Sequence, residues 1–122
     1  MSTPIEPDSP AIEIRFTPEF KRNLRALAKR YRHIRSDLEP VLNQLRNGEA
    51  PGDQIPGTGY TLYKVRIRNS DARRGKSGGY RIIYYIQTPT NVVLITLYSK
   101  SDQSDVSADE VRQIIRVMSE SS

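Results

Sequence analysis

Two stretches near the middle of the chain decide the fold: LYKVRIR at residues 62–68 and YRIIYYI at residues 80–86. Both are rich in β-branched and aromatic residues, and the first alternates apolar and polar positions, which is typical of a half-buried strand. The polar, glycine-containing residues 69–79 connect the two. A third strand is expected at residues 92–98. Three successive strands of this kind predict an antiparallel meander.

The residues before the meander predict one strand and two helices. Residues 12–16 alternate as a strand does, and Thr-Pro at 17–18 marks a helix start, because Thr caps free amides and Pro fits the first turn. A capping box at Ser36 and Glu39 and a stop at residues 47–48 bound the second helix. The two apolar stripes are Phe20, Leu24, Leu27 and Tyr31, then Leu38, Val41, Leu42 and Leu45.

The C-terminal part predicts one more helix, because the capping box at Ser107 and Glu110 precedes an apolar face. Residues 49–59 hold two prolines and three glycines and are expected to form a loop. The order β-α-α-β-β-β-α predicts an α+β fold, with one mainly antiparallel four-stranded sheet, an N-terminal helical hairpin and a C-terminal helix. Residues 1–10 are expected to be a flexible tail and residues 11–120 a single domain.

Composition excludes several classes of protein. No apolar run approaches the roughly 20 residues that span a bilayer, so no membrane protein is expected. The first ten residues lack the basic and apolar regions of a secretory signal. The chain has no cysteine, which excludes a disulfide scaffold, a cysteine-based zinc site and a cysteine nucleophile, and fits the reducing cytoplasm.

Positive charge is concentrated in the middle of the chain. The formal net charge is +5 and the pI about 9.7, and between residues 64 and 81 Asp71 is the only acid. The cations of that stretch are Lys64, Arg66, Arg68, Arg73, Arg74, Lys76 and Arg81. Strand alternation puts Lys64, Arg66 and Arg68 on one face, and the meander would add Arg81. Such a face either binds a polyanion or is the solvated outer surface of the sheet.

Metal and nucleotide sites are not expected. Gly75-Lys76-Ser77 is no phosphate-binding P-loop, because Ser70 stands where its first glycine belongs and a strand follows instead of a helix. His33 is the only histidine and is expected at the surface, in the link between the helices. The C-terminal acids resemble the acidic start of a helix more than a metal site.

Three short motifs carry a resemblance to a known family. YKVRIR at 63–68, GGYRIIYY at 78–85 and LYSK at 97–100 resemble the RelE/ParE superfamily of bacterial toxins, and GKSGGYR at 75–81 is most similar to its RelE/HigB-like branch. The resemblance extends over about residues 12–118. It implies a toxin of a type II toxin–antitoxin system, which cuts mRNA on the ribosome without metal or cofactor and is inhibited by an antitoxin protein.

The resemblance also implies roles for individual residues. Lys64 and Arg66 match the cationic pair of the family's second strand, and Arg81 matches the arginine that contacts the scissile phosphate. RNA-binding roles are expected for Arg68, Arg73, Arg74, Lys76 and Lys100.

The sequence departs from the family pattern at two places. Ser101 and Ser107 stand where the RelE pattern has an arginine and a tyrosine, which leaves the proton-transfer group open. Two alternatives follow: a ParE-like poison of DNA gyrase without nuclease activity, and a non-catalytic RNA-binding or decayed toxin.

Overall fold

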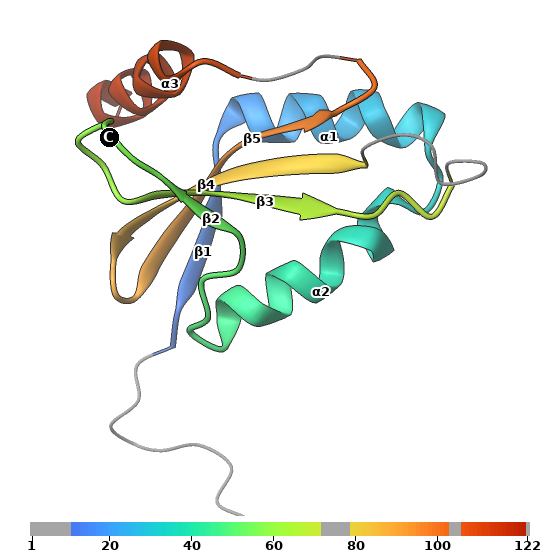
Figure 1. Cartoon of the computed structure of the whole chain (residues 1–122), viewed down its shortest axis with the longest axis horizontal. Coiled ribbons are helices and arrows are strands. Elements are labelled where there is room, and N and C mark those ends of the chain that lie inside the picture. The colour runs from blue at the N-terminus through green and yellow to red at the C-terminus, as the bar shows by residue number, and fades with distance from the viewer. Residues whose placement is uncertain (1–10, 72–78, 103–105, 122) are drawn as a thin grey trace, which may run out of the picture.

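A five-stranded sheet organises the computed structural model, with the strand order β1-β5-β4-β3-β2 (Figure 1). The structure describes residues 11–71, 79–102 and 106–121, so the expected tail at residues 1–10 lies outside it. The elements are β1 (Glu13–Phe16), α1 (Pro18–Arg30), α2 (Ile34–Arg46), β2 (Asp53–Ile55), β3 (Leu62–Ile67), β4 (Tyr80–Thr88), β5 (Asn91–Ser99) and α3 (Ala108–Ser121). β1 runs parallel to β5, and the other neighbouring pairs are antiparallel.

The pairing of β3, β4 and β5 confirms the predicted meander and the α+β class, but the predicted number of four strands is wrong. The additional strand β2 lies in the segment that was expected to be a loop, and it pairs with the first half of β3. Its three residues are too few to show an alternating pattern. Tertiary contact creates the strand. Gly52 has φ +96°, and a Cβ there would lie 2.4 Å from the carbonyl oxygen of Lys64.

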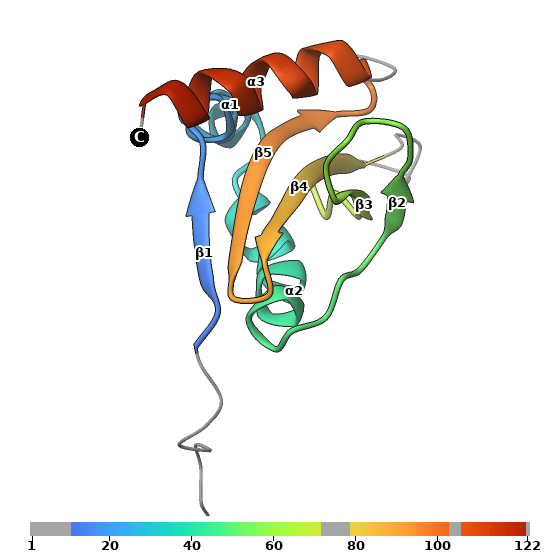
Figure 2. The same cartoon turned by 90° about the vertical axis from the view of Figure 1, so that its left-hand side faces the viewer.

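Helices pack on both faces of the sheet. One core lies between the sheet and the helices α1 and α2, which contribute buried residues such as Phe20, Leu27, Leu38 and Leu45. The second, smaller core lies on the opposite face, where Val111 and Ile115 of α3 pack against sheet residues that include Ile83 and Ile95. Figure 2 shows α3 beside β5 and α1. Within the described residues, no helix is both long and apolar enough to cross a bilayer.

The predicted helix starts are correct for two of the three helices. The Thr17 hydroxyl caps α1 by accepting the Phe20 N–H. The capping box of α3 also forms, since Ser107 and Glu110 exchange hydrogen bonds of 3.0 and 3.1 Å. The box predicted at Ser36 and Glu39 is wrong, because α2 already begins at the buried Ile34 and Ser36 lies inside its first turn.

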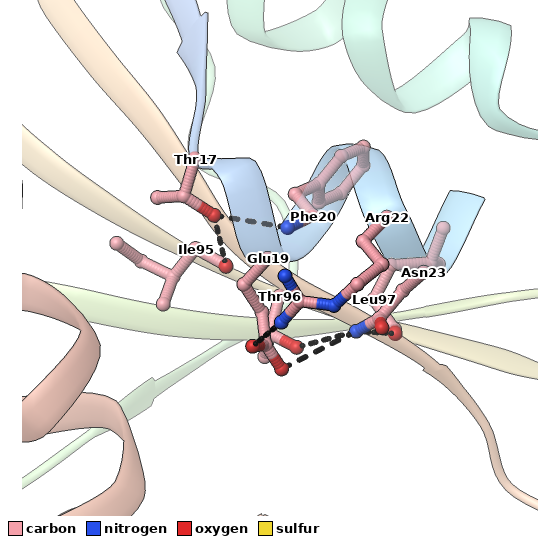
Figure 3. A network of polar contacts seen from close by, with 8 residues as sticks. All are labelled: Thr17, Glu19, Phe20, Arg22, Asn23, Ile95, Thr96 and Leu97. Carbon is pink, nitrogen blue, oxygen red and sulfur yellow. Dashed lines mark hydrogen bonds and ion pairs between the residues drawn. The ribbon is translucent and has the colours of Figure 1, made fainter. Parts of the chain in front are cut away.

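The N-cap residue Thr17 and the α1 residue Asn23 cover part of the β5 edge that β1 leaves open (Figure 3). The Thr17 hydroxyl donates to the carbonyl oxygen of Ile95 at 2.7 Å while it accepts the Phe20 N–H at 3.0 Å. The Asn23 amide donates to the carbonyl oxygen of Leu97 at 3.0 Å. A buried carbonyl without a partner is costly. These bonds therefore hold α1 in a fixed position along β5.

We expect Thr17→Ala to lower the free energy of unfolding by about 1–3 kcal/mol, because it removes a helix cap and leaves a buried carbonyl without its donor. Urea denaturation followed by circular dichroism measures the change. Thr17→Ser is the matched control. It keeps the hydroxyl, so its free energy of unfolding should fall much less. Equal losses in the two variants would show that the methyl group matters and that the hydroxyl does not.

Candidate functional site

The pairing of β3 with β4 brings three of the predicted cations to one face of the sheet. Arg66 lies directly opposite Arg81, and Lys64, two residues along β3, lies opposite Ile83. Alternate residues of a strand share a face. All three cations therefore project from the side opposite to Val65, which is part of the core under α1 and α2. The expected juxtaposition of residues 64, 66 and 81 is present.

The three cations line an open hollow of about 480 Å³. Among the described residues, Gly52, Asp53 and Val65 also line it. The Lys64 and Arg81 side chains are half-buried, and Arg66 is exposed. Like charges in one hollow repel each other, and the repulsion falls when an anion binds between them. An ammonium with two planar guanidinium groups is well suited to a phosphate, because each guanidinium can donate two parallel hydrogen bonds to its oxygens.

Two of the other expected RNA-binding residues, Arg68 and Lys100, are described by the structure and do not line this hollow. Arg68 is exposed beyond the end of β3 and lines a second hollow next to α2, which Arg66 also borders. Lys100 follows β5, and its backbone N–H donates to the Gly79 carbonyl at 2.8 Å. The predicted RNA-binding residues Arg73, Arg74 and Lys76 lie outside the described part of the chain. Arg68 therefore extends the cationic surface along the β3 side of the sheet.

Asp53 belongs to the hollow and was not predicted from the sequence. It lies on β2 directly opposite Lys64, in the same antiparallel register that joins β2 to β3. Cβ atoms of directly opposed residues lie about 4.5–5.5 Å apart. The signal for Asp53 was absent from the sequence pattern, because the strand that positions it was not predicted.

His33 is exposed in the link between α1 and α2, as expected, and it contacts a distant acid. Its Nδ1 lies 2.7 Å from Oδ1 of Asp71, and its backbone N–H donates to the other carboxylate oxygen at 2.8 Å. These two hydrogen bonds, the ring contact first, hold the pKa of Asp71 below its usual range. Asp37 of α2 accepts the Ser70 N–H at 3.0 Å. Both carboxylates tie the segment after β3 to the start of α2.

Two buried tyrosines provide a test of how hydroxyl partners affect stability. Within the described residues the buried Tyr80 hydroxyl has no hydrogen-bond partner, and burial, reinforced by the Asp37 and Asp71 carboxylates, raises its pKa. We expect Tyr80→Phe to leave the free energy of unfolding unchanged or to raise it by up to about 1 kcal/mol. Tyr84→Phe should lower it by about 1–2 kcal/mol, because the Tyr84 hydroxyl donates to the Pro51 carbonyl. Urea denaturation of both variants measures the two changes. A larger loss of unfolding free energy in Tyr80→Phe than in Tyr84→Phe would contradict the expectation.

A comparison with protein families shows which family the chain resembles, independently of the site geometry. Residues 19–121 match a family model described as the RelE toxin of the RelE/RelB toxin–antitoxin system. The match covers β3, β4 and β5 with all the cations named above, and it leaves out β1. Among the described residues, no group of three or more His, Cys, Asp and Glu side chains is placed to hold a metal ion.

Proposed function

The chain belongs to the RelE family of toxins from toxin–antitoxin systems, and from this premise we propose that it inhibits translation by cutting mRNA on the ribosome without a metal ion. The observation that carries the proposal is the single hollow lined by Lys64, Arg66 and Arg81. Membership of the family implies an antitoxin partner. Ribosomes and mRNA place the proposed activity in the cytoplasm.

The proposed reaction is an in-line attack of a ribose 2′-oxygen on the adjacent phosphorus. The bond from phosphorus to the 5′-oxygen of the next nucleotide breaks, which leaves a 2′,3′-cyclic phosphate and a 5′-hydroxyl. The transition state carries more negative charge on its phosphoryl oxygens than the substrate does. Fixed cations around those oxygens therefore stabilise the transition state more than the ground state, which is the condition for catalysis.

We assign the scissile phosphate to the three cations of the hollow. Arg66 on β3 and Arg81 on β4 are directly opposed and project from the same face of the sheet. Their guanidinium groups can therefore hold one phosphate from two sides. Lys64 adds a compact charge next to them. Contacts with other phosphates of mRNA or rRNA are assigned to Arg68, Arg73, Arg74, Lys76 and Lys100. Contacts of this kind make binding strongly dependent on salt.

The direct test uses ribosomes that hold a defined, end-labelled mRNA. Addition of the purified protein is expected to produce cleavage within the ribosome-bound mRNA and ends that carry the cyclic phosphate and the 5′-hydroxyl. The same reaction with mRNA alone measures how far the ribosome is needed. Expression in growing cells should stop translation while mRNA is cut. Intact mRNA on ribosomes that continue to translate would refute the proposal.

The two alternative functions give different results in the same assays. A gyrase poison would leave mRNA intact and cause gyrase-dependent DNA breaks, and its toxicity would survive loss of the cations in the hollow. A non-catalytic RNA-binding protein would bind RNA with a steep salt dependence and never cut it. The hollow favours the nuclease over the gyrase poison, because contacts with a protein target do not require three converging cations.

A further inference from the structure

Among the described residues that line the hollow, one side chain is acidic. Asp53 reaches it from β2 and lies opposite Lys64 in the strand register. Its side chain is exposed, so a substrate can reach it. An acid at a phosphate-binding site weakens substrate binding, because the two negative charges repel each other. A carboxylate in this position therefore needs a reason other than affinity.

The need for a group that accepts the proton of the attacking 2′-hydroxyl provides that reason. Ammonium and guanidinium groups only donate hydrogen bonds, so protonated Lys64, Arg66 and Arg81 cannot accept the proton of the attacking 2′-hydroxyl. Of the six residues that line the hollow in the described structure, Asp53 alone has a side chain that accepts. Ser101 and Ser107 do not line it, and Ser107 is engaged in the cap of α3.

Two contacts fix the backbone from which Asp53 projects. Gly52 packs against the Lys64 carbonyl so closely that no Cβ fits. The Pro51 carbonyl accepts the hydroxyl hydrogen of Tyr84, a residue of β4. Both contacts lie immediately before β2, so this three-residue strand is anchored to the two strands that carry the cations. A general base needs such a fixed position.

We propose that Asp53 is the general base of the nuclease reaction and that Lys64, opposite it, is the general acid; this inference rests on the proposed function. The Asp53 carboxylate takes the proton of the 2′-hydroxyl as the 2′-oxygen forms its bond to phosphorus. The Lys64 ammonium gives a proton to the 5′-oxygen as the bond from phosphorus to that oxygen breaks. The proton on Asp53 then passes to Lys64, either directly or through solvent, and both groups return to their starting states.

The first test measures binding and cleavage separately on ribosome-bound mRNA. Asp53→Asn is nearly isosteric and removes the charge, so we expect the rate of a single turnover to fall by about 10²–10³-fold, the usual size of a general-base contribution. Binding of a substrate analogue that lacks the attacking 2′-hydroxyl should tighten by about 2–10-fold, because a repulsive charge has gone. Glu49→Gln is the matched control, since Glu49 is exposed before β2 and outside the hollow, and it should change neither quantity.

The second test separates the base from the acid. In an mRNA with sulfur in place of the 5′-bridging oxygen, the leaving group is a thiolate that departs without a proton. This substrate should restore most of the rate that Lys64→Ala loses, whereas Asp53→Asn should remain slow. Restoration of Asp53→Asn by sulfur would overturn the assignment, because Asp53 would then assist only the leaving group.

Failure of the inference differs from failure of the proposed function. If the unsubstituted protein cuts ribosome-bound mRNA and Asp53→Asn cuts it equally fast, the proposed function stands and Asp53 is not the base. If the unsubstituted protein never cuts mRNA, the proposed function falls and the assignment of Asp53 falls with it. Urea denaturation of Asp53→Asn checks that β2 still folds, and Asp53→Glu should retain part of the activity by restoring the carboxylate.

Discussion

Arg81→Ala is expected to reduce cleavage of ribosome-bound mRNA by about 10²–10³-fold, the loss that follows removal of one fixed donor from a developing negative charge. Arg81 lies opposite Arg66 and lines the same hollow as Lys64. Its guanidinium is therefore placed to bind the proposed scissile phosphate together with these two cations. A single-turnover cleavage assay measures the rate, and growth after induction measures toxicity. Arg81→Lys should recover only part of the loss, since a lysine cannot make two parallel bonds to a phosphate.

The control for net charge is Arg25→Ala. Arg25 is exposed on α1, and that helix packs on the other face of the sheet. This variant should cut mRNA at nearly the original rate, and both variants should have similar urea midpoints. A double substitution of Lys64 and Arg81 by alanine should abolish cleavage and toxicity together. Toxicity that persists in the double variant would favour a target such as gyrase over mRNA.

Gly79→Ala is expected to cause the largest loss of stability of any single substitution considered, about 3 kcal/mol, or roughly 10–20 °C in Tm. Gly79 has φ +74°, and a Cβ there would lie 2.3 Å from the backbone oxygen of Ile67. Its carbonyl also accepts the Lys100 N–H. The residue thus lies between the end of β3 and the end of β5, and neither neighbour can move without breaking the sheet. Thermal and urea denaturation measure the loss.

Gly57→Ala is the matched control for backbone strain. Gly57 has a similar φ of +76°, but among the described atoms nothing would lie within 4 Å of a Cβ at this position. Gly57→Ala should therefore lower the free energy of unfolding by only about 1 kcal/mol. Equal losses at the two positions would mean that positive φ alone accounts for the effect and that the close approach to Ile67 is unimportant.

Local patterns predicted most of the fold. Alternation at residues 62–68 and 80–86 is a property of the strands themselves, and it correctly indicated which side chains share a face. The capping box before α3 is equally local, and it formed. The box at Ser36 failed because burial of Ile34 starts α2 earlier, and burial depends on the rest of the molecule.

The candidate site was only partly predictable for the same reason. Lys64, Arg66 and Arg81 lie on strands with clear alternation, so their convergence followed from the meander. Asp53 lies on a strand of three residues that exists only through its pairing with β3, and no local pattern marks it. The contact between His33 and Asp71 joins positions 38 residues apart, which a single sequence cannot reveal.

The parallel pairing of β1 with β5 affects how a newly synthesised chain reaches its final shape. β1 lies beside residues 91–94, and the hydrogen bond that follows it joins positions 78 residues apart. Contacts over such separations form late and slow the folding of a domain. The β3–β4 hairpin can pair while synthesis continues, but the N-terminal strand has no partner until β5 has emerged from the exit tunnel. Each new molecule therefore completes its sheet only after β5 has been synthesised and released from the tunnel.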